Sequence, residues 1–321
     1  IGYSILKYAC AGADRFARRM KFSTLTAEEL RQAYKHALPN LDFSIVNAGL
    51  CRHEVDWLYG INLSRALTES ARKSSGRYMT LSTGRVQGST LRFVVEREQE
   101  IQTFVPVPYW QVQATVEIND QILQAEPEVD RFDTRAEAER VASLSDRKDG
   151  IVEEVESKAA QVIPPFPFDL SSLQAEAYRH FRMAPRHSLS IAERLYLDAL
   201  ISYPRTSSQR LPVSIDTRHV LELLSRNPSY QRHAAALLAF RELRPNEGKK
   251  VDPAHPAVYP TGALPKRSLE PKESRIYDLV VKRFMATHGQ PATRESLKVT
   301  IVVNGLRFYV CLLYTSDAAD E

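Results

Sequence analysis

The hydrophobic period of the sequence changes three times, from helical to strand-like, back to helical, and again to strand-like. Apolar residues recur at helical spacing up to about residue 104, and the stretch from Phe104 to Ile118 then alternates as strands do. Helical spacing returns between Ser171 and His288, and two strands follow around Asn304-Gly305. We therefore predict a multi-domain α+β fold in which one β-rich domain carries a helical insertion.

Caps, prolines and turns place the individual elements. Thr26 and Glu29 have the spacing of a capping box, which predicts the start of a helix. The run Pro164–Phe168 marks a boundary, because neither a helix interior nor a central strand tolerates that density of proline. The expected helices cover 44–72, 135–144, 172–180, 190–200 and 274–288, and the expected strands cover 104–118, 121–125 (after a turn at Asn119-Asp120), 150–158, 297–303 and 306–310.

Length and composition describe an ordinary globular protein. With 321 residues, 43% hydrophobic and 26% charged, the chain is not collagen-like, simply disordered or a disulfide scaffold. No stretch reaches the roughly 20 apolar residues of a membrane span. The three cysteines, Cys10, Cys51 and Cys311, are scattered without a CxxC pair, which argues against a zinc site and for a reducing compartment.

Charge is unevenly distributed along the chain. Residues 117–157 hold 13 acidic and 5 basic residues, whereas the remaining 280 residues have an excess of 12 basic residues. A basic surface is typical of a polyanion partner, although a solvated surface with a random imbalance explains the charge equally well.

The segment Ser202-Tyr-Pro-Arg-Thr-Ser-Ser carries the clearest candidate chemistry. Pro204 favours an extended Tyr203, so Arg205 is expected on the same side of the backbone. A tyrosine hydroxyl beside a guanidinium could serve as nucleophile and phosphate clamp. Spacing alone also fits a buried tyrosine and a surface arginine in a turn.

Further polar residues could bind phosphate or simply cap and pair. Ser82–Gln87 opens a helix whose backbone amides could hold a phosphate. Arg52, His53 and Asp56 share one helical turn and could line a groove. His255 lies in a proline-rich loop, where a lone histidine is more often structural.

Taken together, these segments resemble type IA DNA topoisomerases, especially the archaeal branch. The resemblance is carried, in the family's order, by CRHEVDWLYGINLSRAL (51–67), LSTGRVQGSTLRFVVERE (81–98), PPFPFDLSSLQ (164–174), LISYPRTSS (200–208) and AHPAVYPTG (254–262). It extends over about residues 1–310.

The resemblance implies a role for each matched residue. Tyr203 would attack a phosphodiester of single-stranded DNA and form a 5′-phosphotyrosine, so that strand passage and religation relax negative supercoils without ATP. Arg205 would hold the scissile phosphate, and His255 would join the hydrogen-bond network of the active site. The implied DNA-binding residues are Arg52, His53, Asp56, Ser82, Gly84, Arg85, Gln87, Thr206 and Ser207.

The resemblance also implies a toroidal architecture. The expected parts are the end of a Toprim domain (1–20), a helical DNA-binding base (21–104), a β-rich arch that acts as a gate (105–163 and 292–310), a helical domain with the tyrosine (164–291) and a probable non-native tail (311–321). The partner would be single-stranded or underwound DNA, and the protein would be monomeric, cytoplasmic and nucleoid-associated.

Two departures from the family's pattern matter. Ser207 stands where many members have aspartate. Ile1–Leu6 resembles the helix that follows the acidic DxDxEG motif, so we expect the Mg²⁺ site to lie upstream of this chain, with no metal site within it. C-terminal zinc modules would likewise lie outside the chain. We therefore expect this piece to bind DNA but to cleave it poorly.

Other functions remain open at this point. Helices within 171–225 could form a helix-turn-helix that binds duplex DNA without chemistry. Tyrosine recombinases also use tyrosine and arginine, but they form a 3′-phosphotyrosine and lack the Tyr-Pro-Arg-Thr form found here. A helical scaffold would not need five ordered motifs, and no helicase motif supports a reverse gyrase as the parent.

Overall fold

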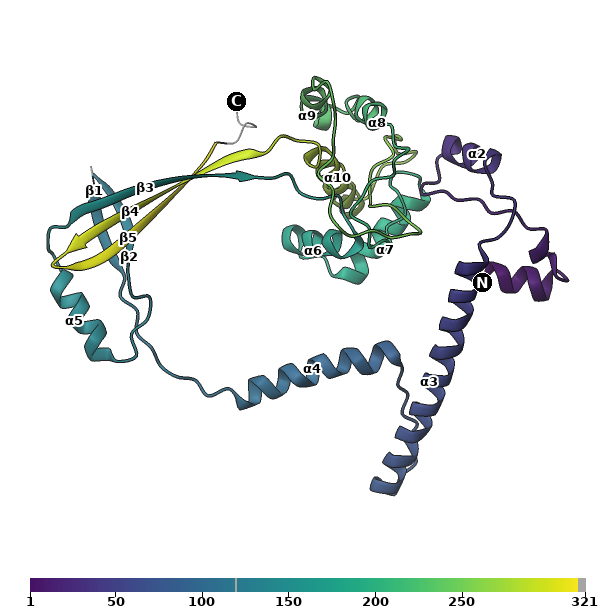
Figure 1. Ribbon diagram of the computed structural model, residues 1–321, viewed down its shortest axis with the longest axis horizontal. Coiled ribbons are helices and arrows are strands. Elements are labelled where there is room, and N and C mark those ends of the chain that lie inside the picture. The colour runs from purple at the N-terminus through teal and green to yellow at the C-terminus, as the bar shows by residue number, and fades with distance from the viewer. Residues whose placement is uncertain (119, 317–321) are drawn as a thin grey trace. The chain divides into compact units, whose positions relative to one another are not determined.

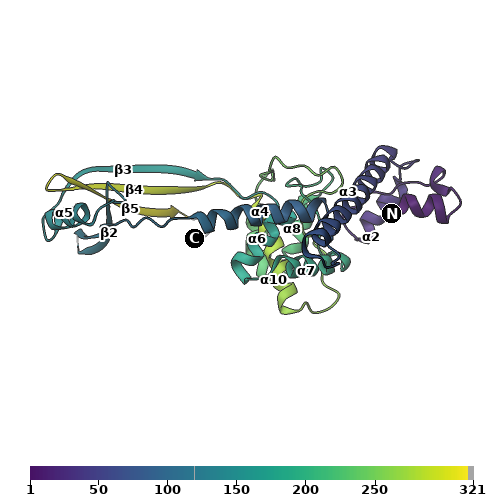
Figure 2. The same ribbon diagram turned by 90° about the horizontal axis from the view of Figure 1, so that it is seen from below.

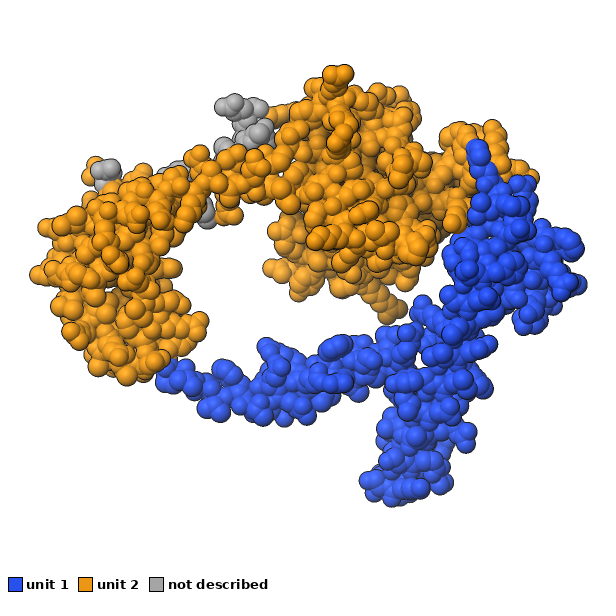
Figure 3. All heavy atoms as spheres, viewed as in Figure 1, with its two compact units in different colours: residues 1–20, 36–108 blue, residues 21–35, 109–321 orange. Residues whose placement is uncertain are grey.

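The computed structural model describes residues 1–118 and 120–316. The chain divides into two compact units (Figure 3). The first unit consists of Ile1–Met20 and His36–Pro108, and the second of Lys21–Lys35 and Tyr109–Glu321. Residues 21–35, which we expected in the helical base, therefore group with the second unit.

The first unit is helical. It contains α1 (Gly2–Ser4), a π-helix (Ile5–Ala9), a 3-10 turn (Ala13–Arg15), α3 (Phe43–Ser75) and α4 (Arg85–Thr103). The Asp42 carboxylate caps α3 by accepting the Ile45 N–H at 3.2 Å. Gly76 ends α3 with φ of 69°, a left-handed conformation that glycine adopts at little cost.

Side-chain hydroxyls of α3 tie down the loop that leads into α4. Ser64 Oγ donates to the Thr83 carbonyl and accepts the Thr83 N–H, at 3.1 and 3.0 Å. One helical turn later, Thr68 Oγ1 makes the same pair of bonds with Leu81, at 3.1 and 3.0 Å. The two residues are four apart on the helix and their partners two apart on an extended strand, so the loop runs alongside α3 in one register.

The second unit contains α2 (Ala27–Lys35) and a five-stranded sheet. The strands are β1 (Ala114–Ile118), β2 (Gln121–Pro127), β3 (Ile151–Val162), β4 (Ala292–Val303) and β5 (Leu306–Ser316). Their order is β1-β2-β5-β4-β3, and each pair is antiparallel. The strands β3 and β4 lie side by side over their length in both views (Figures 1 and 2).

One face of this sheet packs into a small core with α5 (Arg135–Ser145). Val141 of α5 lies against the buried residues of β2, β4 and β5. Gly150 precedes β3, and a Cβ there would come within 2.6 Å of Ile301 Cγ2, so a side chain does not fit. The buried members of the core are Ala125, Val299, Ile301, Val303, Phe308 and Val310.

The strand predictions need corrections, and β4 also starts at Ala292 rather than at 297. Residues 104–113 are not a strand; Pro106 and Pro108 cannot donate to a ladder, and Trp110 makes a single bridge to Phe132. Strand β3 continues to Val162, and β5 continues past Val310 to Ser316, six residues into the expected tail. The expected turn residue Asn119 lies outside the described residues, although Ile118 pairs with Gln121.

The helical insertion, here named the tyrosine domain (residues 164–291), forms the main core. Its helices are α6 (Leu170–Phe181), α7 (Pro185–Leu197), α8 (Thr217–Leu224), α9 (Pro228–Leu238) and α10 (Pro271–Ala286). The Asp169 side chain caps α6 in a reciprocal pair with Ser172. The α7 helix ends three residues earlier than expected, because Ala199 has a φ of 59°. Fully buried members of the core include Phe168, Leu173, Ile191, Leu195, Leu221, Ile276 and Val280.

Hydropathy gives no sign of a bilayer-crossing segment: among the described residues, none of the helices combines the length and apolar character that a membrane span requires.

Candidate active site

The turn that carries Tyr203 is anchored by its backbone on both sides. The Ser202 N–H donates to the Tyr259 carbonyl at 2.9 Å, and Ser202 Oγ accepts the Tyr259 N–H at 3.0 Å and donates to the Ala257 carbonyl at 3.1 Å. The Tyr203 N–H donates to the carbonyl of Ser23 at 2.9 Å. The backbone of Tyr203 is thus held between the 257–259 segment and the segment that leads into α2.

The Tyr203 ring lies between two other rings. Its centroid is 4.6 Å from that of His255 and 5.2 Å from that of Tyr196, which it meets nearly edge-on at 71°. Burial raises the pKa of Tyr196, and the neighbouring Tyr203 and Glu29 raise it further. Within the described part of the chain, Nδ1 of His255 is buried and has no hydrogen-bond partner. A catalytic role is one explanation for a buried polar atom of this kind.

The guanidinium of Arg205 is exposed and paired. Its Nε donates to Oε1 of Glu193 on α7 at 2.6 Å. Both side chains are partly open to solvent, so the pair contributes little to stability and can exchange for a phosphate.

Thr206 and Ser207 hold the 252–255 loop in place. Thr206 is buried, and its hydroxyl donates to the His255 carbonyl and accepts the Ser208 N–H, both at 3.0 Å. The N–H and hydroxyl of Ser207 contact Oδ2 of Asp252 at 3.3 and 3.2 Å. Partial burial opposes ionisation of Asp252, but the hydrogen bonds it accepts from this loop and from Ser207 lower its pKa overall. The Thr206 hydroxyl thus has both a donor and an acceptor partner within the protein.

The other predicted contacts lie in the first unit, where α3 faces the start of α4. Arg85 Nε and Nη2 donate to the two Asp56 oxygens at 2.7 and 3.3 Å, and Arg52 Nε lies 3.6 Å from Asp56. The hydrogen bond from Arg85 lowers the pKa of the Asp56 carboxyl. The structure thus joins three of the predicted residues into one exposed ion cluster.

The start of α4 has an open N-terminus. Gly84 occupies the N-cap position, and no side chain caps the helix. Ser82, Gln87 and His53 are exposed. Uncapped amides at the start of a 19-residue helix can bind an anion.

The residues present do not form a metal site. Across residues 1–118 and 120–316, no group of three His, Cys, Asp or Glu side chains could hold a metal ion.

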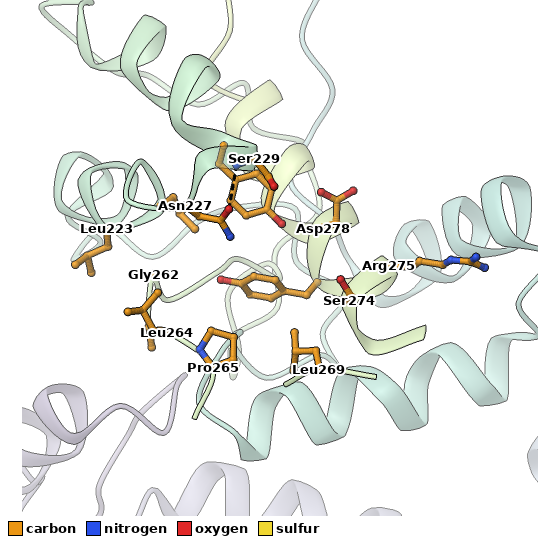
Figure 4. A pocket seen from close by; sticks show the side chains of 14 residues that line it. Leu223, Asn227, Ser229, Gly262, Leu264, Pro265, Leu269, Ser274, Arg275 and Asp278 are labelled. Atoms are coloured by element: carbon orange, nitrogen blue, oxygen red, sulfur yellow. Dashed lines mark hydrogen bonds between the residues drawn. The ribbon is translucent and has the colours of Figure 1, made fainter. Parts of the chain in front are cut away.

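A separate pocket of about 310 Å³ opens in the tyrosine domain between α8, α9 and α10 (Figure 4). Tyr230 and Tyr277 line it, and burial raises the pKa of Tyr277 to about 12. The Asn227 side chain accepts the Ser229 N–H at its edge, and Arg275 points away from it (Figure 4). None of the sequence-predicted site residues lines this pocket.

Comparison with known proteins identifies the family. A family model described as DNA topoisomerase matches residues 40–315. This chain belongs to the type IA DNA topoisomerases. Its sequence is 47% identical, over 97% of the chain and 45% of the relative, to DNA topoisomerase 1 of Pyrococcus horikoshii. It is 41% identical, over 96% of the chain and 42% of the relative, to DNA topoisomerase 1 of Methanothermobacter thermautotrophicus.

A solved topoisomerase shares the fold. Full-length topoisomerase I of Thermotoga maritima superposes with a TM-score of 0.74 at 27% identity, over 98% of this chain and 51% of that protein. The predicted family and its α+β fold are confirmed. The chain spans less than half the length of the two topoisomerases from P. horikoshii and M. thermautotrophicus.

Sequence reasoning about this topoisomerase chain missed three contacts of the predicted site. They are the ring of Tyr196, the carboxylate of Glu193 and the Ser23 carbonyl. Glu193 and Tyr196 lie 12 and 7 positions before their partners, on the helix that precedes the turn, and that proximity was an available signal. The contact with Ser23 had none, because it joins segments 180 residues apart.

Proposed function

We propose that this chain carries the strand-cleaving tyrosine of its topoisomerase. The Tyr203 hydroxyl oxygen would attack a phosphorus of single-stranded DNA, forming the Tyr203–phosphate bond and breaking the bond to the 3′ oxygen. The phenolic proton would leave to solvent or a base, and the released 3′ oxygen would gain a proton. Reversal would restore the phosphodiester without ATP, because the phosphotyrosine retains the bond energy.

One observation carries this assignment within the family. Tyr203 is fixed through its backbone N–H and lies in ring contact with a histidine whose Nδ1 is buried and unpaired among the described residues. A fixed backbone reduces the freedom that a nucleophile must lose on reaching the phosphorus.

Arg205 would bind the scissile phosphate. It lies two residues after the nucleophile, and its only ion pair in the described chain, with Glu193, is solvent-exposed. A guanidinium gains more from a phosphate with two oxygens in reach than from a single contact at 2.6 Å to one carboxylate oxygen. Charge that develops on the phosphate during attack would strengthen this interaction further.

The ion cluster of Arg52, Asp56 and Arg85 and the open start of α4 would bind the DNA backbone. The overall consequence would be relaxation of negatively supercoiled DNA. The preference for single strands, the monomeric state and association with the nucleoid remain predictions.

The decisive test is a denaturing gel of the longest available form of the protein with single-stranded DNA labelled at either end, in the presence of Mg²⁺. We expect a covalent adduct on the fragment downstream of the break, abolished by Tyr203→Phe. Tyr196→Phe is the matched control, because it removes the hydroxyl of the adjacent ring and should retain the adduct. Arg205→Ala should slow adduct formation by about 100-fold.

Two results would contradict the proposal. An adduct on the upstream fragment would indicate a 3′-phosphotyrosine, as in a tyrosine recombinase. An adduct that persists in Tyr203→Phe would assign the nucleophile to another residue.

A further inference from the structure

The segment that leads into α2 contacts the turn carrying Tyr203, and its geometry depends on one carboxylate. Glu29 lies in the first turn of α2 and folds back over the chain that precedes the helix. Its Oε1 accepts the Ser23 N–H at 2.6 Å, and its Oε2 accepts the Thr24 N–H at 3.1 Å and the Thr24 hydroxyl. The expected capping box is therefore only half formed: the Glu29 N–H donates to Thr26 Oγ1 at 3.4 Å, but the carboxylate serves Ser23 and Thr24 instead.

This turn is embedded in the tyrosine domain rather than exposed. Thr24 is 2% exposed, and Leu25 lines a cavity of about 250 Å³ with residues 197–200, 265–267 and 269. The charge of Glu29 also acts on two tyrosines of this region. Burial raises the pKa of both Tyr196 and Tyr259, and the charge of Glu29 raises each further.

The Ser23 carbonyl accepts a hydrogen bond from the backbone of Tyr203, and the residue that follows Tyr203 cannot donate one. Tyr203 has one backbone donor, and that N–H goes to Ser23 at 2.9 Å. The next residue is Pro204, which has no N–H to offer. The bond to Ser23 is therefore the one that the backbone N–H of the nucleophile itself makes.

We infer that Glu29 is a positioning residue for Tyr203, acting through the Ser23–Thr24 turn. The inference rests on the proposed function of Tyr203 as the nucleophile. A carboxylate can accept both backbone N–H groups and the hydroxyl at once, whereas a neutral amide has a single acceptor oxygen. Replacing Glu29 by glutamine therefore leaves one of these donors without a partner, and the Ser23 carbonyl loses its fixed direction.

The test compares Glu29→Gln with Glu28→Gln in the longest available form of the protein. Both changes remove one acidic charge from the first turn of α2, but Glu28 is exposed, and its partners among the described residues, Arg31 and Gln32, belong to the same helix. Amide hydrogen exchange is measured at Tyr203, with the Ser202 amide as an internal reference because its acceptor is Tyr259. We expect exchange at Tyr203 to accelerate about 5- to 10-fold in Glu29→Gln, the loss of one hydrogen bond, and to be unchanged at Ser202 and in Glu28→Gln.

The same variants are then assayed for adduct formation and for affinity for single-stranded DNA. Glu29→Gln should slow adduct formation about 10- to 100-fold, since a small displacement of the nucleophile has that effect, while its affinity stays within about twofold of the wild type. A purely structural role would lower rate and affinity together. Thr24→Val, which keeps the shape of a buried residue and removes one bond to Glu29, should act in the same direction with a smaller effect.

The outcomes separate the two proposals. If wild-type protein forms no Tyr203-dependent adduct, the proposed function fails, and hydrogen exchange alone still decides whether Glu29 positions Tyr203. Unchanged exchange at Tyr203, equal effects of Glu28→Gln and Glu29→Gln, or an adduct rate unaffected by faster exchange would each overturn the inference.

Discussion

The tyrosine domain and the α3–α4 arm (residues 43–103) obtain their geometry in different ways. The tyrosine domain surrounds its turn with fully buried side chains such as Leu195 and Ile201. In the α3–α4 arm no residue is buried, and Trp57 and Phe93 are 61% and 72% exposed. A buried apolar core therefore supports the hydrogen bonds of the proposed catalytic turn, whereas polar ties between α3 and the start of α4 hold the proposed DNA contact without such a core.

The largest loss of stability is expected when a leucine is replaced by alanine, and the comparison is between a leucine of the tyrosine domain and one of the α3–α4 arm. Leu195→Ala removes a side chain that is 0% exposed and should cost the tyrosine domain about 3–5 kcal/mol. Leu58→Ala, at a position 52% exposed, should cost under about 1 kcal/mol. Amide hydrogen exchange in α7 and in α3 measures each local free energy of opening.

Equal losses of stability at Leu195 and Leu58 would contradict the difference in packing between the two regions. They would mean that Leu58 is buried in solution, against another part of the protein or another copy.

A second comparison uses ion pairs in place of apolar contacts. Glu273 is 0% exposed, and Arg267 donates to its two oxygens at 2.7 and 3.0 Å. Glu273→Gln should destabilise the tyrosine domain by about 2 kcal/mol, because a buried pair loses one charge while its partner can still reach solvent. Asp56→Asn breaks the exposed pair with Arg85 and should leave the thermal stability of the arm unchanged.

The pH dependence of unfolding provides a further test of the pair between Glu273 and Arg267. The hydrogen bond from Arg267 lowers the pKa of Glu273 from 4.5 to about 2. A lowered pKa in the folded state means that the carboxylate contributes stability above pH 4.5 and loses it as the pH falls toward 2. The free energy of unfolding of the wild type should therefore fall more steeply across this window than that of Glu273→Gln, measured by chemical denaturation at each pH. Parallel curves would contradict the assigned pKa.

The smallest loss of stability is expected for the hydrogen bonds between α3 hydroxyls and the loop before α4. Thr68→Val removes both bonds to the backbone of Leu81 and should free this end of the loop by about 1 kcal/mol. Thr68→Ser keeps the hydroxyl and should behave like the wild type. Amide exchange at Leu81 reads the effect directly, and faster exchange in Thr68→Ser than in Thr68→Val would assign the tie to packing of the threonine methyl group.

Much of the secondary structure follows from local signals in the sequence. The helix 135–145 begins at a threonine cap, the helix 170–181 at an aspartate cap, and the hairpin of β4 and β5 at Asn304-Gly305. The alternation of residues 104–113 does not produce a strand, because Pro106 and Pro108 lack the N–H donors that a ladder needs. The adjacency of β2 and β5 has no local signal, since it joins residues far apart along the chain.

The candidate site was only partly accessible to the same reasoning. Proline spacing suggested that Tyr203 and Arg205 act together, and the family motif added His255, whose ring contact with Tyr203 appears in the structure. A DNA contact of Thr206 stays a prediction, and in the structure its hydroxyl donates to the carbonyl of His255. A sequence shows which residues can donate or accept, but not which partners folding has already supplied.

The tyrosine domain is joined to the sheet at two points, the end of β3 and the start of β4. Val162, the last residue of β3, pairs with Ala292, the first of β4. Antiparallel partners lie roughly 5 Å apart, about the span of a tight turn. The whole tyrosine domain could therefore be deleted, or replaced by another domain, and a two-residue linker would still connect the end of β3 to the start of β4.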